Sequence, residues 1–109
     1  MAIEFTVQIK GANWLIKKLT PRKFKKLHDV ICPALTIPID REIHLNSELY
    51  TPYYIRHELF HAYVAECNTE SMTDMTLDDM EELSASLVAE FCFDIAKLAD
   101  EIFSKFKSK

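Results

Sequence analysis

A five-residue segment, His57-Glu58-Leu59-Phe60-His61, carries two histidines four residues apart with a glutamate directly after the first. In an α-helix, residues four apart lie one above the other on the same face, so the two imidazoles can bind one tetrahedral Zn²⁺ ion. Glu58 then lies beside the ligands, where its carboxylate can act as a general base on a metal-bound water. This HExxH spacing predicts a hydrolytic zinc centre, provided that the segment is helical and a third ligand completes the site.

The third ligand must come from outside the motif, because a catalytic zinc takes three protein ligands and leaves one position open for water. The remaining histidines, His28 and His44, both precede the motif, so an acidic residue after it is the better candidate. Glu82 is favoured, with Glu81 as the alternative, because both fall in the first turns of a long predicted helix that must pack against the motif helix. Small residues on the side of the helix that carries Glu82 would allow a close approach.

Other acidic side chains also follow the motif, namely Glu66, Glu70, Asp74, Asp78, Asp79 and Glu90. Glu66 comes five residues after His61, about 140° round the helix, and is expected to face elsewhere. Glu70 and Asp74 fall in a predicted loop, which would fix a ligand poorly. Acidic residues at the start of a helix also interact favourably with the helix dipole, and this purely structural role applies to Glu81 and Glu82 as well.

Periodicity along the chain predicts an α+β fold in one domain, residues 1–109. Apolar and polar residues alternate over Ile3–Ile9, which is typical of a half-buried strand. The elements expected after it are a strand over Trp14–Leu19, a helix over Pro21–Val30 with Phe24, Leu27 and Val30 inward, adjacent strands over Ala34–Ile37 and Glu42–Asn46, the motif helix from Pro52 to about Cys67, a loop over 68–76 and a final helix from Leu77 to about Phe106.

Composition excludes several classes of protein. No apolar run approaches the roughly 20 residues that span a bilayer, and the N-terminal residues lack the pattern of a signal peptide, so a cytoplasmic protein without membrane association is expected. The three cysteines, Cys32, Cys67 and Cys92, form no CxxC pair, which argues against a disulfide framework or a thiolate zinc site. They are predicted to be reduced and buried.

The charge is distributed unevenly along the chain. Residues 1–50 sum to +3 and residues 51–109 to −7, and six of the basic residues fall between Lys17 and Lys26. The favoured interpretation of this segment is the solvated face of a short amphipathic helix. No aromatic stacking pattern or recognised binding motif accompanies it, so no nucleic-acid partner is expected.

A resemblance to a known family rests on three features of the segment from about Arg41 to Phe91: Leu45-Asn46, the run Tyr54-Ile55-Arg56-His57-Glu58-Leu59-Phe60-His61-Ala62-Tyr63, and Glu81-Glu82 some twenty residues later. In these features the chain resembles the small gluzincin metallopeptidases. More narrowly, it is similar to the ImmA/IrrE-type and phage-encoded minimal metallopeptidase domains.

The resemblance implies a minimal zincin-like fold, in which a small twisted sheet packs on the HExxH helix and on a long C-terminal glutamate helix, with Zn²⁺ between the helices. It implies His57 and His61 as ligands, Glu58 as general base and a glutamate of the final helix as third ligand. It also implies that the strand Glu42–Asn46 is the sheet edge that holds an extended substrate.

The chain departs from the larger thermolysin-like members of the family in one respect. Ala85 and Ser86 occupy the positions where those proteins often carry an aspartate that orients a histidine ligand. Side chains that could stabilise the oxyanion of the reaction are three tyrosines and two histidines, which the sequence does not rank: Tyr53, Tyr54, Tyr63, His28 and His44.

The leading functional interpretation is a zinc metalloendopeptidase of narrow specificity that hydrolyses a protein or peptide, with a regulatory protein in a phage-related setting as one candidate substrate. The alternative is a zinc-binding protein-interaction module of the same fold that is catalytically weak or inactive. The small size of the chain favours this alternative, and the intact Glu58 argues against it. In a third interpretation, the HExxH spacing is coincidental and the chain is a helical interaction protein.

Overall fold

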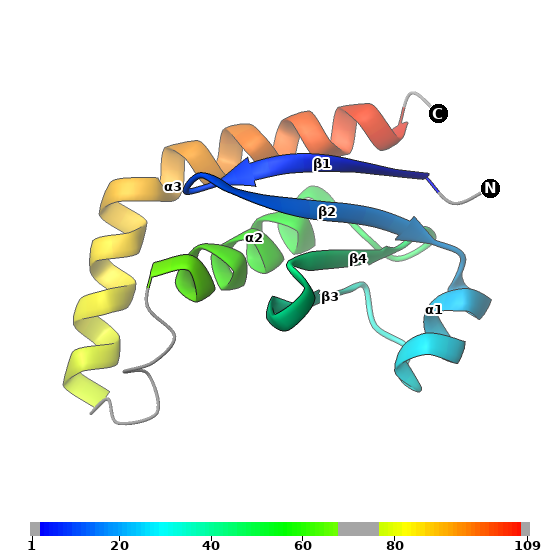
Figure 1. Cartoon of the computed structure of the whole chain (residues 1–109), viewed down its shortest axis with the longest axis horizontal. Coiled ribbons are helices and arrows are strands. Elements are labelled where there is room, and N and C mark those ends of the chain that lie inside the picture. The colour runs from blue at the N-terminus through cyan, green and yellow to red at the C-terminus, as the bar shows by residue number, and fades with distance from the viewer. Residues whose placement is uncertain (1–2, 68–76, 108–109) are drawn as a thin grey trace.

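Four strands form one mixed sheet at the centre of the structure: β1 (Ile3–Ile9), β2 (Ala12–Leu19), β3 (Ala34–Ile37) and β4 (Glu42–Asn46) (Figure 1). The computed structural model describes residues 3–67 and 77–107, without the side chains of residues 77–80 and 83. The strand order is β1-β2-β4-β3. β1 pairs antiparallel with β2, β2 pairs parallel with β4, and β4 pairs antiparallel with β3.

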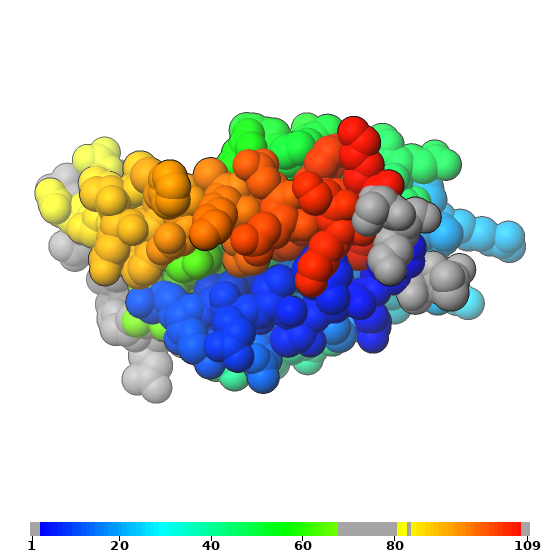
Figure 2. Space-filling view, turned by 90° about the horizontal axis from the view of Figure 1, so that it is seen from above, coloured from blue at the N-terminus to red at the C-terminus, as the bar shows by residue number. Residues whose placement is uncertain are grey.

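The described helices are α1 (Pro21–His28), the short 3-10 helix η1 (Pro38–Asp40), α2 (Pro52–Cys67) and α3 (Leu77–Lys107). α1 begins as its sequence predicts, because the Thr20 hydroxyl accepts a hydrogen bond from the backbone N–H of Lys23 and Pro21 is the first helical residue. In the view of Figure 2, α3 lies along β1 and β2. The first turns of α3 extend past the end of the sheet (Figure 1).

α2 and α3 pack on the same face of the sheet and enclose the apolar core. The core residues of these layers include Trp14, Ile16, Ile43 and Leu45 from the sheet, Ile55, Leu59 and Ala62 from α2, and Ile95, Ala99, Ile102 and Phe106 from α3. Burial of one large apolar side chain contributes about 1.5–3 kcal/mol, so this layer holds α2 firmly in one orientation. The predicted α+β class is therefore confirmed.

A chain of polar contacts joins α1 to the other side of β4. Alternate residues of a strand face opposite sides, so Glu42 and His44 point away from the core residues Ile43 and Leu45. His44 Nε2 lies 2.7 Å from Glu42 Oε1, and His28 Nε2 lies 2.9 Å from His44 Nδ1. A carboxylate only accepts, so His44 donates to Glu42 and, while neutral, accepts from His28.

Two details of the predicted strands and helices are wrong. β4 has strands on both sides, so the edge of the sheet beside α2 is β3 rather than Glu42–Asn46. The cause is the parallel pairing of β4 with β2, a long-range contact that the local sequence does not reveal. α1 ends at His28 rather than Val30, because Asp29 adopts a left-handed conformation with a φ of 55°. Leu27 and Val30, expected to face inward, are both exposed, so this part of the prediction is wrong as well.

The remaining structural predictions have mixed outcomes. The three cysteines are free, but Cys92 is exposed and Cys32 and Cys67 are partly exposed, so the prediction that they are buried is wrong. The loop expected over 68–76 lies outside the described residues. Among the helices of the described ranges, none has the length and apolar character needed to cross a bilayer.

The contact between α1 and β4 predicts a pH dependence of stability. Partial burial, and then the charge of His44, lower the pKa of His28 below its usual value of 6.5. The unfolded chain therefore binds a proton near pH 6.5 that the folded chain resists, and the free energy of unfolding falls as the pH drops below that value. Hydrogen bonds from His44 and, to a lesser extent, from Lys17 lower the pKa of the Glu42 carboxyl. The stability that this carboxylate contributes is therefore lost when the pH falls further.

We expect metal-free protein to lose stability between pH 7.5 and pH 5.5, measured as the midpoint of urea unfolding. The variant His28→Gln should lose part of this dependence, whereas Lys23→Gln, at an exposed position of the same helix, should keep it. An equal pH dependence in the wild type and in His28→Gln would contradict this account.

Candidate metal centre and active site

The HExxH motif lies on α2, and the packing of this helix decides where its side chains point. Ile55, Leu59 and Ala62 are buried in the core. Successive residues of a helix are rotated by about 100°, so His57 and His61 point roughly 200° away from Ile55 and Leu59 respectively. Both histidines are accordingly exposed on the outer side of the helix.

The two imidazoles converge in the way that a shared metal ion requires. His57 Nε2 and His61 Nε2 are 3.2 Å apart, and the ring centroids are separated by 4.9 Å at an interplanar angle of 73°. Two nitrogens bound to one tetrahedral zinc, each at about 2.0–2.1 Å, would be about 3.3 Å apart. The donor atoms and their separation therefore fit a zinc ion.

Glu58 faces the edge of the sheet and is largely buried, with 7% of its surface exposed. The Thr36 hydroxyl on β3 lies 2.7 Å from Glu58 Oε1 and 3.2 Å from the backbone oxygen of Glu58. A hydroxyl donates one proton at a time, and the shorter distance and the negative charge favour donation to Oε1. Thr36 thus fixes the position of the carboxylate.

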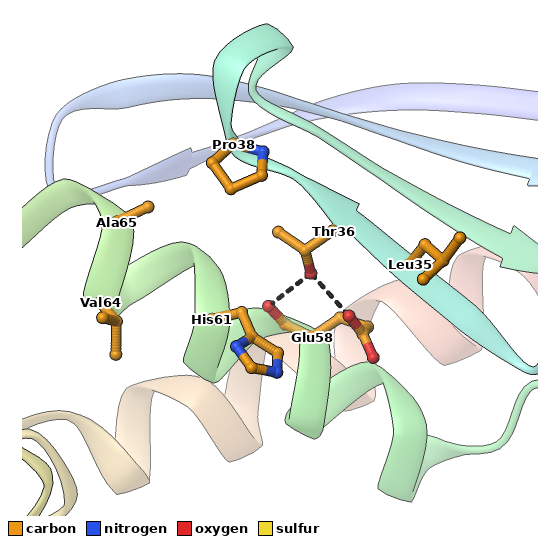
Figure 3. A pocket seen from close by; sticks show the side chains of 7 residues that line it. All are labelled: Leu35, Thr36, Pro38, Glu58, His61, Val64 and Ala65. Carbon is orange, nitrogen blue, oxygen red and sulfur yellow. Dashed lines mark hydrogen bonds between the residues drawn. The ribbon is translucent and has the colours of Figure 1, made fainter. Parts of the chain in front are cut away.

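A groove between α2 and β3 brings the carboxylate and one histidine to the same surface. Figure 3 shows Glu58 and His61 projecting from neighbouring positions of α2, opposite Thr36 on the strand. The groove has a volume of about 390 Å³ and is lined by Leu35, Thr36, Pro38, Glu58, His61, Val64 and Ala65. Most of this lining is apolar, so an extended chain with apolar side chains would fit beside the polar group.

Among the side chains that the structure describes, no third ligand is gathered at the histidine pair. Glu81 and Glu82 are both exposed in the first turns of α3. Within residues 3–67, 81–82 and 84–107, no group of three His, Cys, Asp or Glu side chains is placed to hold a metal ion. The rings of Tyr63 on α2 and Phe91 on α3 contact each other. Tyr63 is about 160° round α2 from His61, so this contact lies on the opposite side of α2 from the histidine. The choice of Glu82 over Glu81 stays a prediction.

The other acidic candidates are accounted for in part. Glu66 faces away from the histidines and accepts hydrogen bonds from Trp14 and Arg41. Glu90 is exposed on α3. Glu70 and Asp74 lie outside the described residues, as do the side chains of Asp78 and Asp79.

The side chains considered as oxyanion donors differ in their position relative to the histidine pair. His28 and His44 bond to each other on the far side of β4, away from the groove. Tyr63 is 6% exposed and packs against Phe91. Tyr53 is 60% exposed and its ring centroid lies 6.4 Å from that of His57, so its ring lies beside the histidine pair. The ring centroid of Tyr54 lies 5.2 Å from that of Tyr53.

Thr36 is a site residue that the sequence did not identify. It is 22 positions from Glu58 in the chain, and their contact depends on β3 being the edge strand beside α2. A weak signal was present, since Thr36 is the polar residue in the otherwise apolar strand Ala34–Ile37. Comparison of the chain with protein-family models, with curated proteins and with solved structures gave no match.

The contact between Thr36 and Glu58 can be tested through stability. Thr36→Val keeps the shape of the side chain but removes the donor to a largely buried carboxylate, which should lower the free energy of unfolding by about 1–3 kcal/mol. Thr6→Val, at an exposed position of β1, is the matched control and should change stability little. Equal urea midpoints for Thr36→Val and Thr6→Val would show that the contact does not hold the carboxylate.

Proposed function

We propose that this chain is a zinc-dependent peptide hydrolase with Glu58 as its general base. The observation that carries the proposal is the convergence of His57 Nε2 and His61 Nε2 to 3.2 Å, next to a carboxylate in an apolar groove. When bound, zinc would supply a Lewis acid that makes water more acidic and polarises a carbonyl group. His57 and His61 would hold the ion, and Glu82 or Glu81 is the proposed third ligand.

The chain's own residues supply the remaining requirements of the reaction. The carboxylate of Glu58, oriented by Thr36, would accept a proton from the attacking water and return it to the leaving amine. β3 is an edge strand, and its outer edge pairs with no described strand. An extended peptide could therefore add to β3 by backbone hydrogen bonds, with its side chains entering the groove.

A zinc-binding interaction module without turnover is the second candidate. One observation favours it, because the Thr36 hydroxyl already donates a hydrogen bond to Glu58 Oε1. In this alternative, zinc would bind at the histidine pair and the groove would hold a peptide segment that is not cut.

Zinc binding is the first test. We expect one zinc ion per chain in isothermal titration of protein freed of metal by a chelator. His57→Ala and His61→Ala should each weaken the affinity by at least about 100-fold, because loss of one imidazole removes a ligand. His28→Ala, on the far side of β4, should leave the affinity unchanged. Binding that survives both motif substitutions would contradict the proposal.

Glu58→Gln separates the hydrolase from the binding module. The amide keeps the size of the side chain and removes the base, so zinc affinity should stay within a few-fold of wild type while cleavage falls by about 100-fold or more. Cleavage is measured by mass spectrometry on denatured cellular proteins incubated with zinc-loaded protein. Cleavage that is absent in the wild type, or equal in the two proteins, would favour the binding module.

The third ligand can be assigned by two single substitutions. If Glu82 is the ligand, Glu82→Ala should weaken zinc binding by at least about tenfold, and Glu81→Ala should not. The reverse result would assign Glu81. Wild-type affinity in both variants would remove these two residues from the site.

A further inference from the structure

Three side chains from separate elements meet beside the candidate active-site groove. Trp14 Nε1 donates to Glu66 Oε2 at 2.8 Å, Arg41 Nε donates to the same oxygen at 2.7 Å, and Arg41 Nη2 donates to Glu66 Oε1 at 3.3 Å. Trp14 is fully buried, and the side chain of Glu66 is 13% exposed. The Arg41 side chain, in contrast, is 55% exposed. The cluster thus has a rigid inner end and a guanidinium at the surface.

The backbone of Arg41 is fixed as well. Its carbonyl accepts from the N–H of Leu15 at 2.9 Å, and its own N–H donates to the carbonyl of Pro38 at 3.1 Å. Arg41 follows η1 in a left-handed conformation with a φ of 52°. Both the backbone and the guanidinium of Arg41 are therefore held in place. Little conformational entropy of this side chain would be lost when it binds a ligand.

This guanidinium lies at one end of the groove that contains Glu58 and His61. A second hollow is lined by Pro38, Ile39, Arg41, Ala65 and Glu66. Pro38 and Ala65 line both this hollow and the catalytic groove. A peptide lying along β3 and past Pro38 would therefore reach Arg41.

The guanidinium of Arg41 binds Glu66 through one edge and has a second edge with N–H donors. A guanidinium has five N–H donors in one plane. Glu66 takes the edge formed by Nε and Nη2, and no other described side chain accepts from Arg41. The edge formed by Nη1 and the second proton of Nη2 can bind one more carboxylate with two parallel hydrogen bonds.

We propose that Arg41, held by Glu66 and Trp14, forms a subsite that selects an acidic residue of the peptide in the groove. The ligand is a single carboxylate rather than a doubly charged phosphate, because Glu66 already neutralises the charge of Arg41 and the specificity comes from hydrogen-bond geometry. This proposal rests on the proposed function only in taking the ligand to be a peptide in the groove.

Trp14 gives a direct readout, because it is the single tryptophan of the sequence and bonds to the carboxylate that holds Arg41. Two acetylated and amidated seven-residue peptides of Ala and Val, one with a central Glu and one with a central Gln, are titrated into the full chain carrying Glu58→Gln, so that the proposed cleavage is suppressed. Tryptophan emission is recorded at low ionic strength, in the presence of a chelator and again with saturating zinc.

The Glu peptide should bind about three- to tenfold more tightly than the Gln peptide, since an exposed bidentate pair contributes modestly. Arg41→Gln should abolish this ratio, and Arg41→Lys should reduce it because the fork is lost while the charge is kept. Arg22→Gln, at an exposed position of α1, is the control and should retain the ratio. Thermal unfolding of each variant verifies that it is folded.

Equal affinities for the two peptides, a ratio that survives Arg41→Gln, or no saturable change with either peptide would overturn the proposal. The measurement needs neither metal nor turnover. A chain that binds no zinc but discriminates between the peptides would keep the subsite and lose the hydrolase. A chain that cleaves peptides but binds both probes equally would keep the hydrolase and lose the subsite.

Discussion

The packing of α2 against the sheet through Ile55, Leu59 and Ala62 sets the directions of His57, Glu58 and His61. Successive side chains of a helix are about 100° apart, so burial of one side of the helix fixes the directions of its other side chains. His57 and His61 are turned outward as a pair, and Glu58 is turned toward β3. The contacts from Glu66 to Trp14 and Arg41 fasten the last turn of α2 to the sheet in the same orientation.

The two flanks of α2 contribute unequally to the proposed chemistry. On the flank facing β3, Thr36 orients the carboxylate of Glu58, and an apolar groove runs along the strand. On the other flank, Tyr63 packs against Phe91 of α3. The features that would position the proposed base and a peptide thus lie on the β3 flank. A carboxylate of α3 would have to approach the histidines from the outer side of α2 to complete the coordination.

The helices and strands that depend on local periodicity were predictable from the sequence. The contacts between segments that are distant in the chain were not. The alternation in Ile3–Ile9 and the Thr20-Pro21 start of α1 act over a few residues, and both elements are present. The edge position of β3 depends on the parallel pairing of β2 with β4, which joins Leu15 to Glu42 across the chain. Because this pairing was not predictable, the partner of Glu58 and the surface presented by Arg41 were not predictable either.

The central proposal is that His57 and His61 hold a zinc ion beside Glu58. Anomalous diffraction at the zinc absorption edge, from crystals grown with zinc, tests it most directly. We expect one strong peak at about 2.0–2.1 Å from both His57 Nε2 and His61 Nε2, on the outer side of α2. A peak at the His28–His44 pair instead, or no ordered zinc at the motif, would contradict it.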